Sequence, residues 1–277
     1  MEFREIRLTD REWVERNRLR SGLPYTAYAF ASLYMWRETY GLTIAGDDSF
    51  FVIHSDDYGG YFCPCGDIDQ CTTFLEQASE PVFFCGKKEL QRLTAEGFRA
   101  EEMPELDEYV CSMAGLALES NENSPNYRRR LRKLKKEYTY QVEEIKDSNV
   151  SEVLEMLQMH LRLQEQEERE DLMAIKEAIT HRKELGIQGI LLRMESGERT
   201  FIIGYENLKD QFTMCGFLAD AALPRSVIAL CIHELAKAEY KEYPYCNIEE
   251  DLGLEGLRRA KRFYSPLYLE HVYRVER

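Results

Sequence analysis

The sequence has few histidines and none of the short motifs that mark common hydrolases. Its histidines, at positions 54, 160, 181, 233 and 271, form no H-x-x-x-H or H-E-x-x-H pair, and no serine lies in a G-x-S-x-G turn. Such motifs place zinc ligands on one helix face or expose a nucleophilic serine. Metalloprotease and serine hydrolase interpretations therefore have no support.

Long hydrophobic runs are also missing. The most apolar window, residues 26–36, is far shorter than the roughly 20 residues that span a bilayer. The first ten residues, MEFREIRLTD, are charged and lack a signal-peptide pattern. We therefore expect a cytoplasmic protein without a transmembrane segment.

Cysteine occurs eight times, but never in the paired C-x-x-C knuckles of structural zinc sites. The segment CPCGDIDQC, residues 63–71, has only C-x-C and C-x5-C spacing. Without an export signal, we expect reduced thiols that pack as small hydrophobic side chains. No metal site is predicted.

Positive charge is scarce and concentrated in one segment. With 36 basic and 50 acidic residues, the net charge of -14 argues against general nucleic-acid binding, because phosphate affinity comes from lysine and arginine. The exception is YRRRLRKLKKEY, residues 127–138. Its seven cations are Arg128, Arg129, Arg130, Arg132, Lys133, Lys135 and Lys136.

The length of 277 residues exceeds that of a usual single domain, about 100–200 residues, and predicts two domains. Polar turn formers in LESNENSPN, residues 118–126, mark the expected boundary between domains 1–120 and 121–277.

A helix should begin directly after this boundary. Ser124 is a candidate N-cap, and Pro125 suits the first helical position. One apolar face is then predicted from Tyr127, Leu131, Leu134 and Tyr138, with the cations on the rest of the circumference.

Hydrophobic periodicity predicts strands and helices in alternation in both halves. Strands are expected at residues 42–45, 50–54, 61–64, 81–85, 138–145, 187–194, 198–206, 211–218, 245–248 and 267–275. Helices are expected at residues 25–40, 68–78, 87–95, 151–163, 172–185, 225–240 and 254–263. This alternation indicates an α/β or α+β fold. The two halves have a similar element order, which two copies of one fold would explain.

Stretches in both halves resemble a known family: FASLYMWRETYG and FCPCGDID, PNYRRRLRKLKKEY, and NIEEDLGLEGLRRAKRFYSP. The whole chain is similar to the DUF2156 family, relatives of the C-terminal domain of phosphatidylglycerol lysyltransferase. The element order of its second half resembles the Gcn5-related N-acetyltransferase (GNAT) fold. The resemblance implies two tandem GNAT-like domains of the α/β (α+β) class, each a mixed, mostly antiparallel sheet flanked by helices.

The same resemblance implies acyl or aminoacyl transfer to an amine or hydroxyl acceptor. Such a reaction needs an activated nucleophile, donors for the developing oxyanion and an acid for the leaving group. GLRRAKRFY resembles the GNAT helix whose tyrosine protonates a departing thiolate, which nominates Tyr264. The alternative is a structural tyrosine at the end of a helix.

Acyl-CoA is doubtful as the donor. GNAT enzymes that bind it usually have a Q/R-x-x-G-x-G/A loop whose backbone N–H groups reach the pyrophosphate. The corresponding segment, CGFLADAALPRS, has no glycine in its loop and carries Asp220, with Arg225 as the only nearby cation. Relatives that use aminoacyl-tRNA need a basic surface instead of this loop.

Two charged segments could serve such a reaction. Arg128, Arg129, Arg132 and Lys133 could bind phosphate or tRNA. An internal clasp with carboxylates is the favoured alternative, because no aromatic side chains alternate with these cations for base stacking. The acidic run EQEERED, residues 165–171, could attract a cationic small-molecule acceptor or form a solvated helix end.

The segment from Asn247 to Pro266 supplies the remaining candidates. It fails as a calcium loop, because Leu252 and Arg258 stand where glycine and glutamate are needed. Asp251 is expected to cap the next helix. The predicted wall of the site consists of Asn247, Glu249, Asp251, Arg258, Lys261 and Tyr264. Of the candidates, Tyr264, Glu249 and Asp251 would be catalytic, and Asn247, Arg258, Lys261 and Arg225 would bind substrate.

Two classes of function therefore remain open. One is an acyl- or aminoacyltransferase with its cleft in the C-terminal domain or between domains. The other is a non-catalytic protein that binds a ligand or partner, keeps the GNAT-like fold and has lost the cofactor loop.

Overall fold

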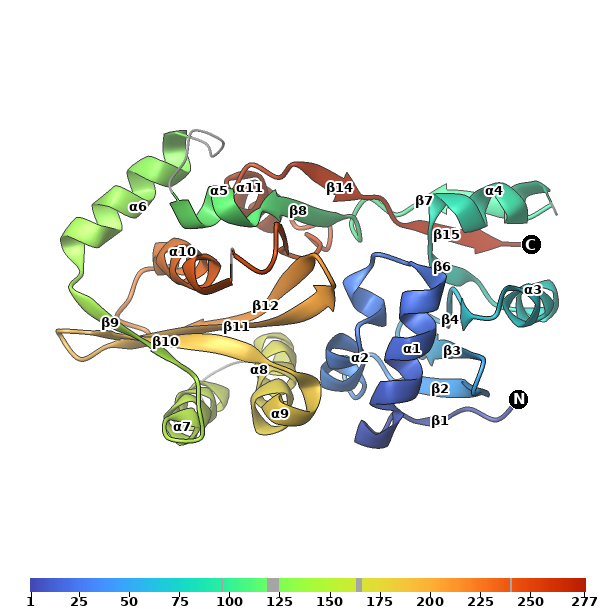
Figure 1. Ribbon diagram of the computed structural model, residues 1–277, viewed down its shortest axis with the longest axis horizontal. Helices are drawn as coiled ribbons and strands as arrows, with labels where there is room; N and C mark the ends of the chain where they lie inside the picture. Colours follow the sequence, from blue (N-terminus) through green and yellow to red (C-terminus); the bar gives the residue numbers. More distant parts are fainter. Residues whose placement is uncertain (96, 119–124, 163–165, 240) are drawn as a thin grey trace. The chain divides into compact units, whose positions relative to one another are not determined.

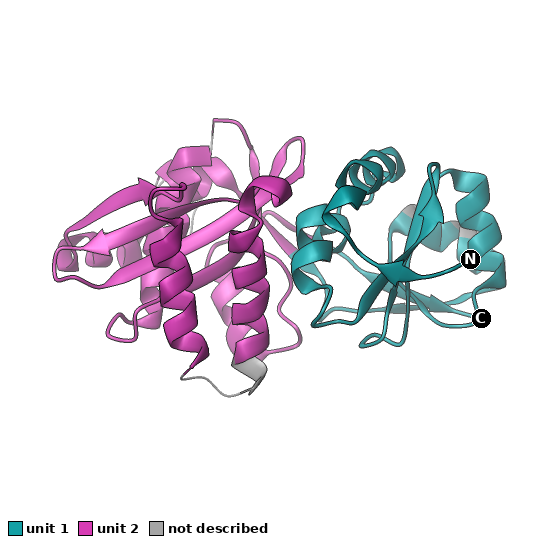
Figure 2. Ribbon diagram, turned by 90° about the horizontal axis from the view of Figure 1, so that it is seen from below, with its two compact units in different colours: residues 1–108, 270–277 teal, residues 109–269 magenta. Residues whose placement is uncertain are grey.

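Two mixed sheets organise the chain, one in each of two units (Figure 2). The computed structural model describes residues 1–95, 97–118, 125–162, 166–239 and 241–277. Unit 1 comprises Met1–Glu108 and Glu270–Arg277, and unit 2 comprises Tyr109–Leu269. The predicted boundary at residues 120 and 121 and the predicted N-cap Ser124 lie outside the described residues. None of the described helices is both long and apolar enough to cross a membrane.

Unit 1 is a sheet flanked by helices. Its strands are β1 (Arg4–Glu5), β2 (Leu42–Asp47), β3 (Phe50–Ser55), β4 (Gly60–Phe62), β5 (Cys65–Gly66), β6 (Val82–Cys85), β7 (Arg99–Glu102) and β15 (Tyr273–Glu276). Its helices are α1 (Arg11–Ser21), α2 (Phe30–Trp36), α3 (Ile68–Gln77) and α4 (Lys87–Ala95). The strand order is β1-β2-β3-β4-β6-β15-β7, with β5 beside β3, and β4 and β6 are parallel.

Unit 2 has a similar composition. Its strands are β8 (Glu108–Ser112), β9 (Tyr140–Glu144), β10 (Gln188–Met194), β11 (Arg199–Leu208), β12 (Gln211–Ala219), β13 (Tyr245–Asn247) and β14 (Tyr268–Glu270). Its helices are α5 (Met113–Leu118), α6 (Pro125–Glu137), α7 (Val150–Leu161), α8 (Gln166–Thr180), α9 (Arg182–Leu185), α10 (Ile228–Glu239) and α11 (Glu255–Arg262). The order is β14-β8-β13-β12-β11-β10-β9, and β12 and β13 are parallel.

Helices cover both faces of the unit 2 sheet, with α10 on one face and α7 and α8 on the other (Figure 1). Alternate residues of β10, Ile190 and Leu192, join the core under α10, while Leu191 between them is also fully buried. A strand that is buried on both faces has a continuous run of apolar residues, as residues 190–192 do here. The predicted apolar face of α6 is confirmed, because Tyr127, Leu131 and Leu134 lie in the same core.

The two sheets have the same strand order and exchange one strand. The sixth place counted from β1 is taken by β15, and the sixth place counted from β9 is taken by β8. Each sheet has its parallel pair in places four and five. Along the chain, β8 follows β7 and β15 follows β14, so each half sends its last strand into the sheet of the other. The predicted two-copy, GNAT-like α/β architecture is confirmed.

The single strand predicted over residues 267–275 is wrong. It divides into β14 and β15, which belong to different sheets. Between them, the carboxylate of Asp107 accepts hydrogen bonds from the backbone N–H of Val272 at 3.0 Å and from His271 Nδ1 at 2.8 Å. These polar contacts hold the chain where it leaves one sheet and enters the other.

The helix predicted over residues 25–40 is also shorter than expected. A 3-10 turn at Thr26–Tyr28 and an extended Ala29 precede α2. The buried Glu108 carboxylate accepts hydrogen bonds from the Thr26 backbone N–H at 2.8 Å and hydroxyl at 2.6 Å. This contact fixes the turn and delays the start of the helix.

Several elements have no counterpart among the predictions: α1, α5, β1, β5, β7 and β8. Helix α1 buries Asn17 and Arg18 beside Val14, so its inward face lacks hydrophobic periodicity. The eight cysteines are free and buried, which confirms that they pack as small apolar side chains.

We expect Val275→Ala to destabilise unit 1 selectively. Val275 is fully buried in β15, between β6 and β7. Loss of its methyl groups should lower the free energy of unfolding by about 2 kcal/mol. In hydrogen exchange, amides of β6 and β7 should lose protection while those of β12 and β13 keep it. Leu267→Ala, at an exposed position, is the control. An equal loss in both sheets would contradict the strand exchange.

Candidate functional site

The parallel strands β12 and β13 pair over only three residues. Gln211, Phe212 and Thr213 lie beside Tyr245, Cys246 and Asn247, and β12 then continues to Ala219. Beyond Asn247 the chain enters a loop in which Glu249 has a φ of 61° and Leu252 a φ of 52°. Residues other than glycine rarely adopt this left-handed backbone conformation. When they do, they are often found at functional sites. The candidate site therefore lies where the parallel pairing of β12 and β13 ends.

Asn247 fixes the strained backbone at Glu249. Its side chain is fully buried, and its Oδ1 accepts a hydrogen bond from the Glu249 backbone N–H at 2.7 Å. Its Nδ2 donates to Gln211 Oε1 at 3.4 Å, which also accepts from Asn207 Nδ2 at 2.7 Å. The Glu249 carbonyl accepts from the Tyr109 backbone N–H at 3.2 Å. The conformation of Glu249 is thus held from both sides.

Thr213 lies directly opposite Asn247 and is fully buried. Among the described residues, its hydroxyl has no hydrogen-bond partner. Buried hydroxyl groups are nearly always paired, because an unpaired one costs free energy comparable to a lost hydrogen bond. Within the described residues, Thr213 Oγ1 is therefore an unsatisfied buried polar group at the end of the β12–β13 pairing.

Glu249 lies close to β12 as well. Burial raises the pKa of the Cys215 thiol well above its usual value, and the nearby negative charge of Glu249 raises it further. Cys215 follows Thr213 by two residues and is buried beside the irregular pairing of β11 and β12. Glu249 and Cys215 therefore lie near each other, each two residues beyond the last pair of β12 and β13, Thr213 and Asn247.

Asp251 is the buried partner of an ion pair with the partly exposed Arg258. Its carboxylate accepts hydrogen bonds from Arg258 Nε at 2.8 Å, Arg258 Nη2 at 3.1 Å and the Tyr109 hydroxyl at 2.6 Å. The Gly253 backbone N–H adds another at 2.9 Å. Burial alone would raise the pKa of the Asp251 carboxyl, but the bonds from Arg258 and Tyr109 hold it below its usual value.

The prediction that Asp251 caps α11 is wrong. Leu254 is the N-cap, and it makes no side-chain hydrogen bond to the helix. Asp251 instead uses both oxygens for the guanidinium of Arg258, because a bidentate, charge-assisted pair is stronger than a cap. All its acceptor positions are occupied, so Asp251 holds the loop and is not placed to act as a free base.

Lys261 supports the same loop from α11. Its side chain is 9 % exposed, and its ammonium group donates to the backbone carbonyl of Ile248. The structure therefore brings together five predicted site residues: Asn247, Glu249, Asp251, Arg258 and Lys261. They form one loop-and-helix unit at the end of β13.

Tyr264 instead lies in the core next to α6. Its ring is 6 % exposed and lies 5.6 Å from that of Tyr127 and 5.3 Å from that of Phe263. Burial, with Cys231 and Cys111 nearby, raises its pKa above the usual range. Its phenol therefore keeps its proton at neutral pH, in apolar surroundings.

The loop between β12 and α10 does not form a pyrophosphate cradle. The Leu223 and Val227 N–H groups already donate to the carbonyls of Asp220 and Pro224. The Asp220 carboxylate accepts from the Arg199 backbone N–H at 2.7 Å and lies 3.5 Å from Arg199 Nε. Arg225 is exposed in the turn before α10. These residues do not fit coenzyme A.

The basic helix α6 presents its cations at the surface. Arg129, Arg130, Arg132, Lys133, Lys135 and Lys136 are exposed, and Arg128 is half-buried. Lys133 pairs with Glu137 of the same helix at 3.9 Å, and Lys135 Nζ lies 2.8 Å from His233 Nε2. Glu165, at the start of the acidic run, lies outside the described residues, while Glu170 and Asp171 are exposed on α8.

Three residues of the site were missed by sequence reasoning: Thr213, Gln211 and Tyr109. Thr213 and Gln211 could have been found from the sequence, because they are polar residues in an otherwise apolar strand. Nothing in the sequence points to Tyr109, because it lies 142 residues before its partner Asp251.

Comparison with known proteins is informative for family and fold. The family model described as "Phosphatidylglycerol lysyltransferase, C-terminal" matches residues 20–276. Among curated proteins there is no match.

Solved structures share the fold over nearly the whole chain. A conserved protein of unknown function from Bacteroides thetaiotaomicron is 23% identical, with a TM-score of 0.83 and 99% of each chain covered. The C-terminal DUF2156 domain of a putative lysylphosphatidylglycerol synthetase from Agrobacterium fabrum is 14% identical, with a TM-score of 0.65, and 95% of this chain and 91% of that chain are covered. L-PGS from Bacillus licheniformis is 13% identical, with a TM-score of 0.65 and coverages of 96% and 91%.

We expect the contribution of Asp251 to stability to depend on pH. Because its folded-state pKa is depressed, the contribution is present above the unfolded pKa of about 4 and is lost as pH falls through the lower folded value. Asp251→Asn should lose about 1–3 kcal/mol of unfolding free energy at pH 7. The difference from the native protein should shrink below about pH 4 in urea titrations.

Glu255→Gln on α11 is the matched control, since its ion pair with Arg259 is exposed. It should change the unfolding free energy by less than about 0.5 kcal/mol. A difference for Asp251→Asn that stayed constant from pH 7 to about pH 3 would show that the ion pair does not carry the effect.

Proposed function

The chain belongs to the family of phosphatidylglycerol lysyltransferase C-terminal domains, and on that premise we propose that it is an aminoacyl- or acyltransferase. The acceptor would be an amine or a hydroxyl, and the donor an aminoacyl-tRNA rather than an acyl-CoA. The observation that carries the proposal is the strained Glu249, held near Cys215 of β12 where the parallel pairing of β12 and β13 ends.

In the proposed reaction, Glu249 takes a proton from the acceptor while the acceptor nitrogen or oxygen attacks the carbonyl carbon of the donor ester. The hydroxyl of Thr213 donates to the developing oxyanion. The ester C–O bond then breaks, and the proton passes from Glu249 to the departing ribose oxygen of the tRNA. A positioned carboxylate of this kind contributes about 10²–10⁴-fold to rate.

The other site residues hold this arrangement. Asn247 fixes the backbone of Glu249, and Arg258 with Asp251 and Lys261 with the Ile248 carbonyl fix the loop. Tyr264 as the acid for the leaving group stays a proposal from the family resemblance. Its apolar surroundings favour Glu249 as the residue that carries the proton.

A donor with many phosphates suits the basic helix α6. Its exposed cations project from a helix whose apolar face is anchored in the core by Tyr127 and Leu131. Each lysine or arginine that contacts a phosphate releases counterions, so affinity depends strongly on salt. We propose Arg128, Arg129, Arg132 and Lys133 as ligands of the tRNA backbone. The acceptor could be a lipid hydroxyl, as the family name implies for its namesake, or a cationic amine.

Glu249→Gln should lower the turnover number by about 100-fold or more, because the base is lost while the fold is kept. The assay supplies total tRNA charged with radiolabelled amino acids, and either phosphatidylglycerol vesicles or spermidine as acceptor. A parallel reaction contains labelled acetyl-CoA. Glu255→Gln is the control and should keep full activity. Tyr264→Phe should keep most activity if Glu249 carries the proton, and lose it if Tyr264 is the acid.

Absence of transfer from every donor would contradict the transferase proposal. In that case, a shift in unfolding temperature with aminoacyl-tRNA, acyl-CoA or spermidine would favour the binding protein. A ligand at 100 times its dissociation constant stabilises a protein by about 2.7 kcal/mol, which is readily measured. Transfer from acetyl-CoA alone would contradict the choice of donor.

Replacing Arg129, Arg132 and Lys133 by glutamine should weaken the binding of aminoacyl-tRNA. The slope of log affinity against log salt should fall by about 2–3, since each lost phosphate contact removes about 0.9. Filter binding between about 50 and 200 mM salt measures this slope. Glutamine at Lys146, Lys209 and Lys241, which are exposed and outside α6, is the charge-matched control. If α6 were an internal clasp, the first variant would lose stability and keep its affinity.

A further inference from the structure

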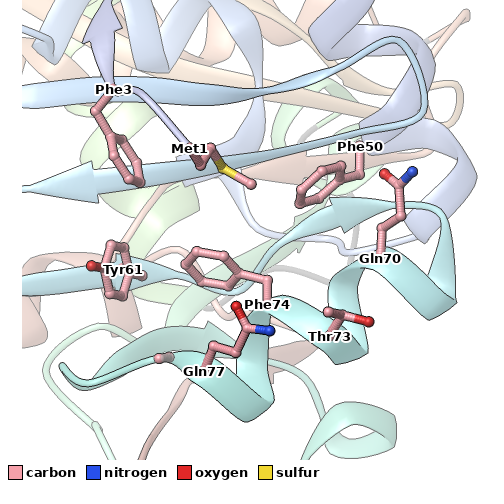
Figure 3. A pocket seen from close by; sticks show the side chains of 9 residues that line it. Met1, Phe3, Phe50, Tyr61, Gln70, Thr73, Phe74 and Gln77 are labelled. Atoms are coloured by element: carbon pink, nitrogen blue, oxygen red, sulfur yellow. The ribbon is translucent and has the colours of Figure 1, made fainter.

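We propose that unit 1 binds a small, neutral, planar aromatic ligand in a pocket beside α3. The pocket has a volume of about 450 Å³. It is lined by the N-terminal segment, β3, β4 and one face of α3 (Figure 3). Sites for small molecules typically measure about 300–1,000 Å³ and combine apolar walls with a few polar groups. This inference is independent of the transferase proposal, which concerns unit 2.

Aromatic rings form the walls of the pocket. Phe3 stacks on Tyr61 with ring centroids 5.8 Å apart and an interplanar angle of 28°. Phe74 meets Tyr61 edge-on, at 5.0 Å and 90°. Phe50, from β3, lies on the side of the pocket away from Tyr61 (Figure 3). Because the rings support one another, their faces are largely preorganised for a flat ligand.

Helix α3 carries two different faces, one packed in the core and one beside the pocket. Cys71 and Leu75 are buried in the core. Gln70, Phe74 and Gln77 recur at i, i+4 and i+7, which places them on a neighbouring face that lines the pocket. The Asp67 side chain caps this helix through the N–H groups of Asp69 and Gln70, so the face is held in place.

Two of the polar groups of the pocket are the amides of Gln70 and Gln77, and the others are the hydroxyls of Tyr61 and Thr73. Ser49 Oγ donates to Gln70 Oε1 at 2.7 Å, which fixes the orientation of that amide. Gln77 lies toward the other end of α3 (Figure 3). None of the lining side chains is charged at neutral pH, and burial, with Glu80 nearby, raises the pKa of Tyr61 still further above that range. A charged ligand would lose hydration here without gaining an ion pair from these side chains.

The ligand chemistry follows from these walls. Aromatic faces favour a planar ring, and primary amide side chains pair with a ligand amide, lactam or heteroaromatic edge. A carboxylate or ammonium group on the same ring system would be disfavoured. The pocket thus selects by charge as well as by shape.

Indole-3-acetamide and indole-3-acetate test this selectivity, because they have nearly the same shape and differ in charge. We expect the amide to saturate one site in titration calorimetry of the full chain and to bind at least about tenfold more tightly than the anion. Phe74→Ala, which removes a wall, and Ala78→Phe, which fills the pocket, should each weaken binding by about tenfold or more. Ile68→Ala, exposed on α3 outside the lining, is the control and should bind normally.

Three outcomes would overturn the proposal. They are no binding of the amide, equal affinity for both compounds, or an Ile68→Ala effect as large as that of Phe74→Ala. Cooperative thermal unfolding checks the fold of each variant. If Phe74→Ala does not fold, Ala78→Phe decides, because it adds atoms to the space and removes no existing contact.

Discussion

The buried carboxylate of Asp251 is the contact on which the candidate site depends. It joins β8, the loop after β13 and α11 through Tyr109, its own backbone and Arg258. An uncompensated carboxylate at this depth would be costly, so its partners are required for the loop to adopt this path. The strained Glu249 backbone is possible only because the loop is fixed there and at Asn247. The ion pair between Asp251 and Arg258 thus supports the position of Glu249, two residues before Asp251.

The strand exchange supplies a part of this contact. Tyr109 lies on β8, which precedes α6 in the chain but belongs to the sheet formed mainly by the second half. Without the exchange, β8 would be missing from that sheet, and the Tyr109 hydroxyl would be missing from the site. The site is therefore built from both halves of the chain, although every residue in it belongs to unit 2. A domain cut at residue 120 would separate Tyr109 from Asp251.

The sequence predicted local structure well where a hydrophobic period was strong. The α6 face and strands β10, β11 and β12 follow directly from apolar spacing. It failed where polar contacts between distant segments decide the structure, as at Glu108 with Thr26 or Asp107 with Val272. The predicted loop residues lie together in the structure, as their closeness in sequence suggested. The cap predicted for Asp251 was wrong, because a helix cap and an ion pair with Arg258 are compatible with the same local sequence.

The distribution of charge underlies both parts of the functional proposal, the binding of tRNA by α6 and the exclusion of acyl-CoA as donor. A chain with a net charge of -14 repels polyanions, and only a concentrated surface such as α6 can reverse the local field. The loop after β12 offers no comparable site for a pyrophosphate, because Asp220 and its own backbone bonds occupy it. A donor that brings many phosphates, contacted away from the reacting carbonyl, satisfies both constraints. A compact nucleotide cofactor satisfies neither, and the proposed choice of donor rests on this distribution of charge.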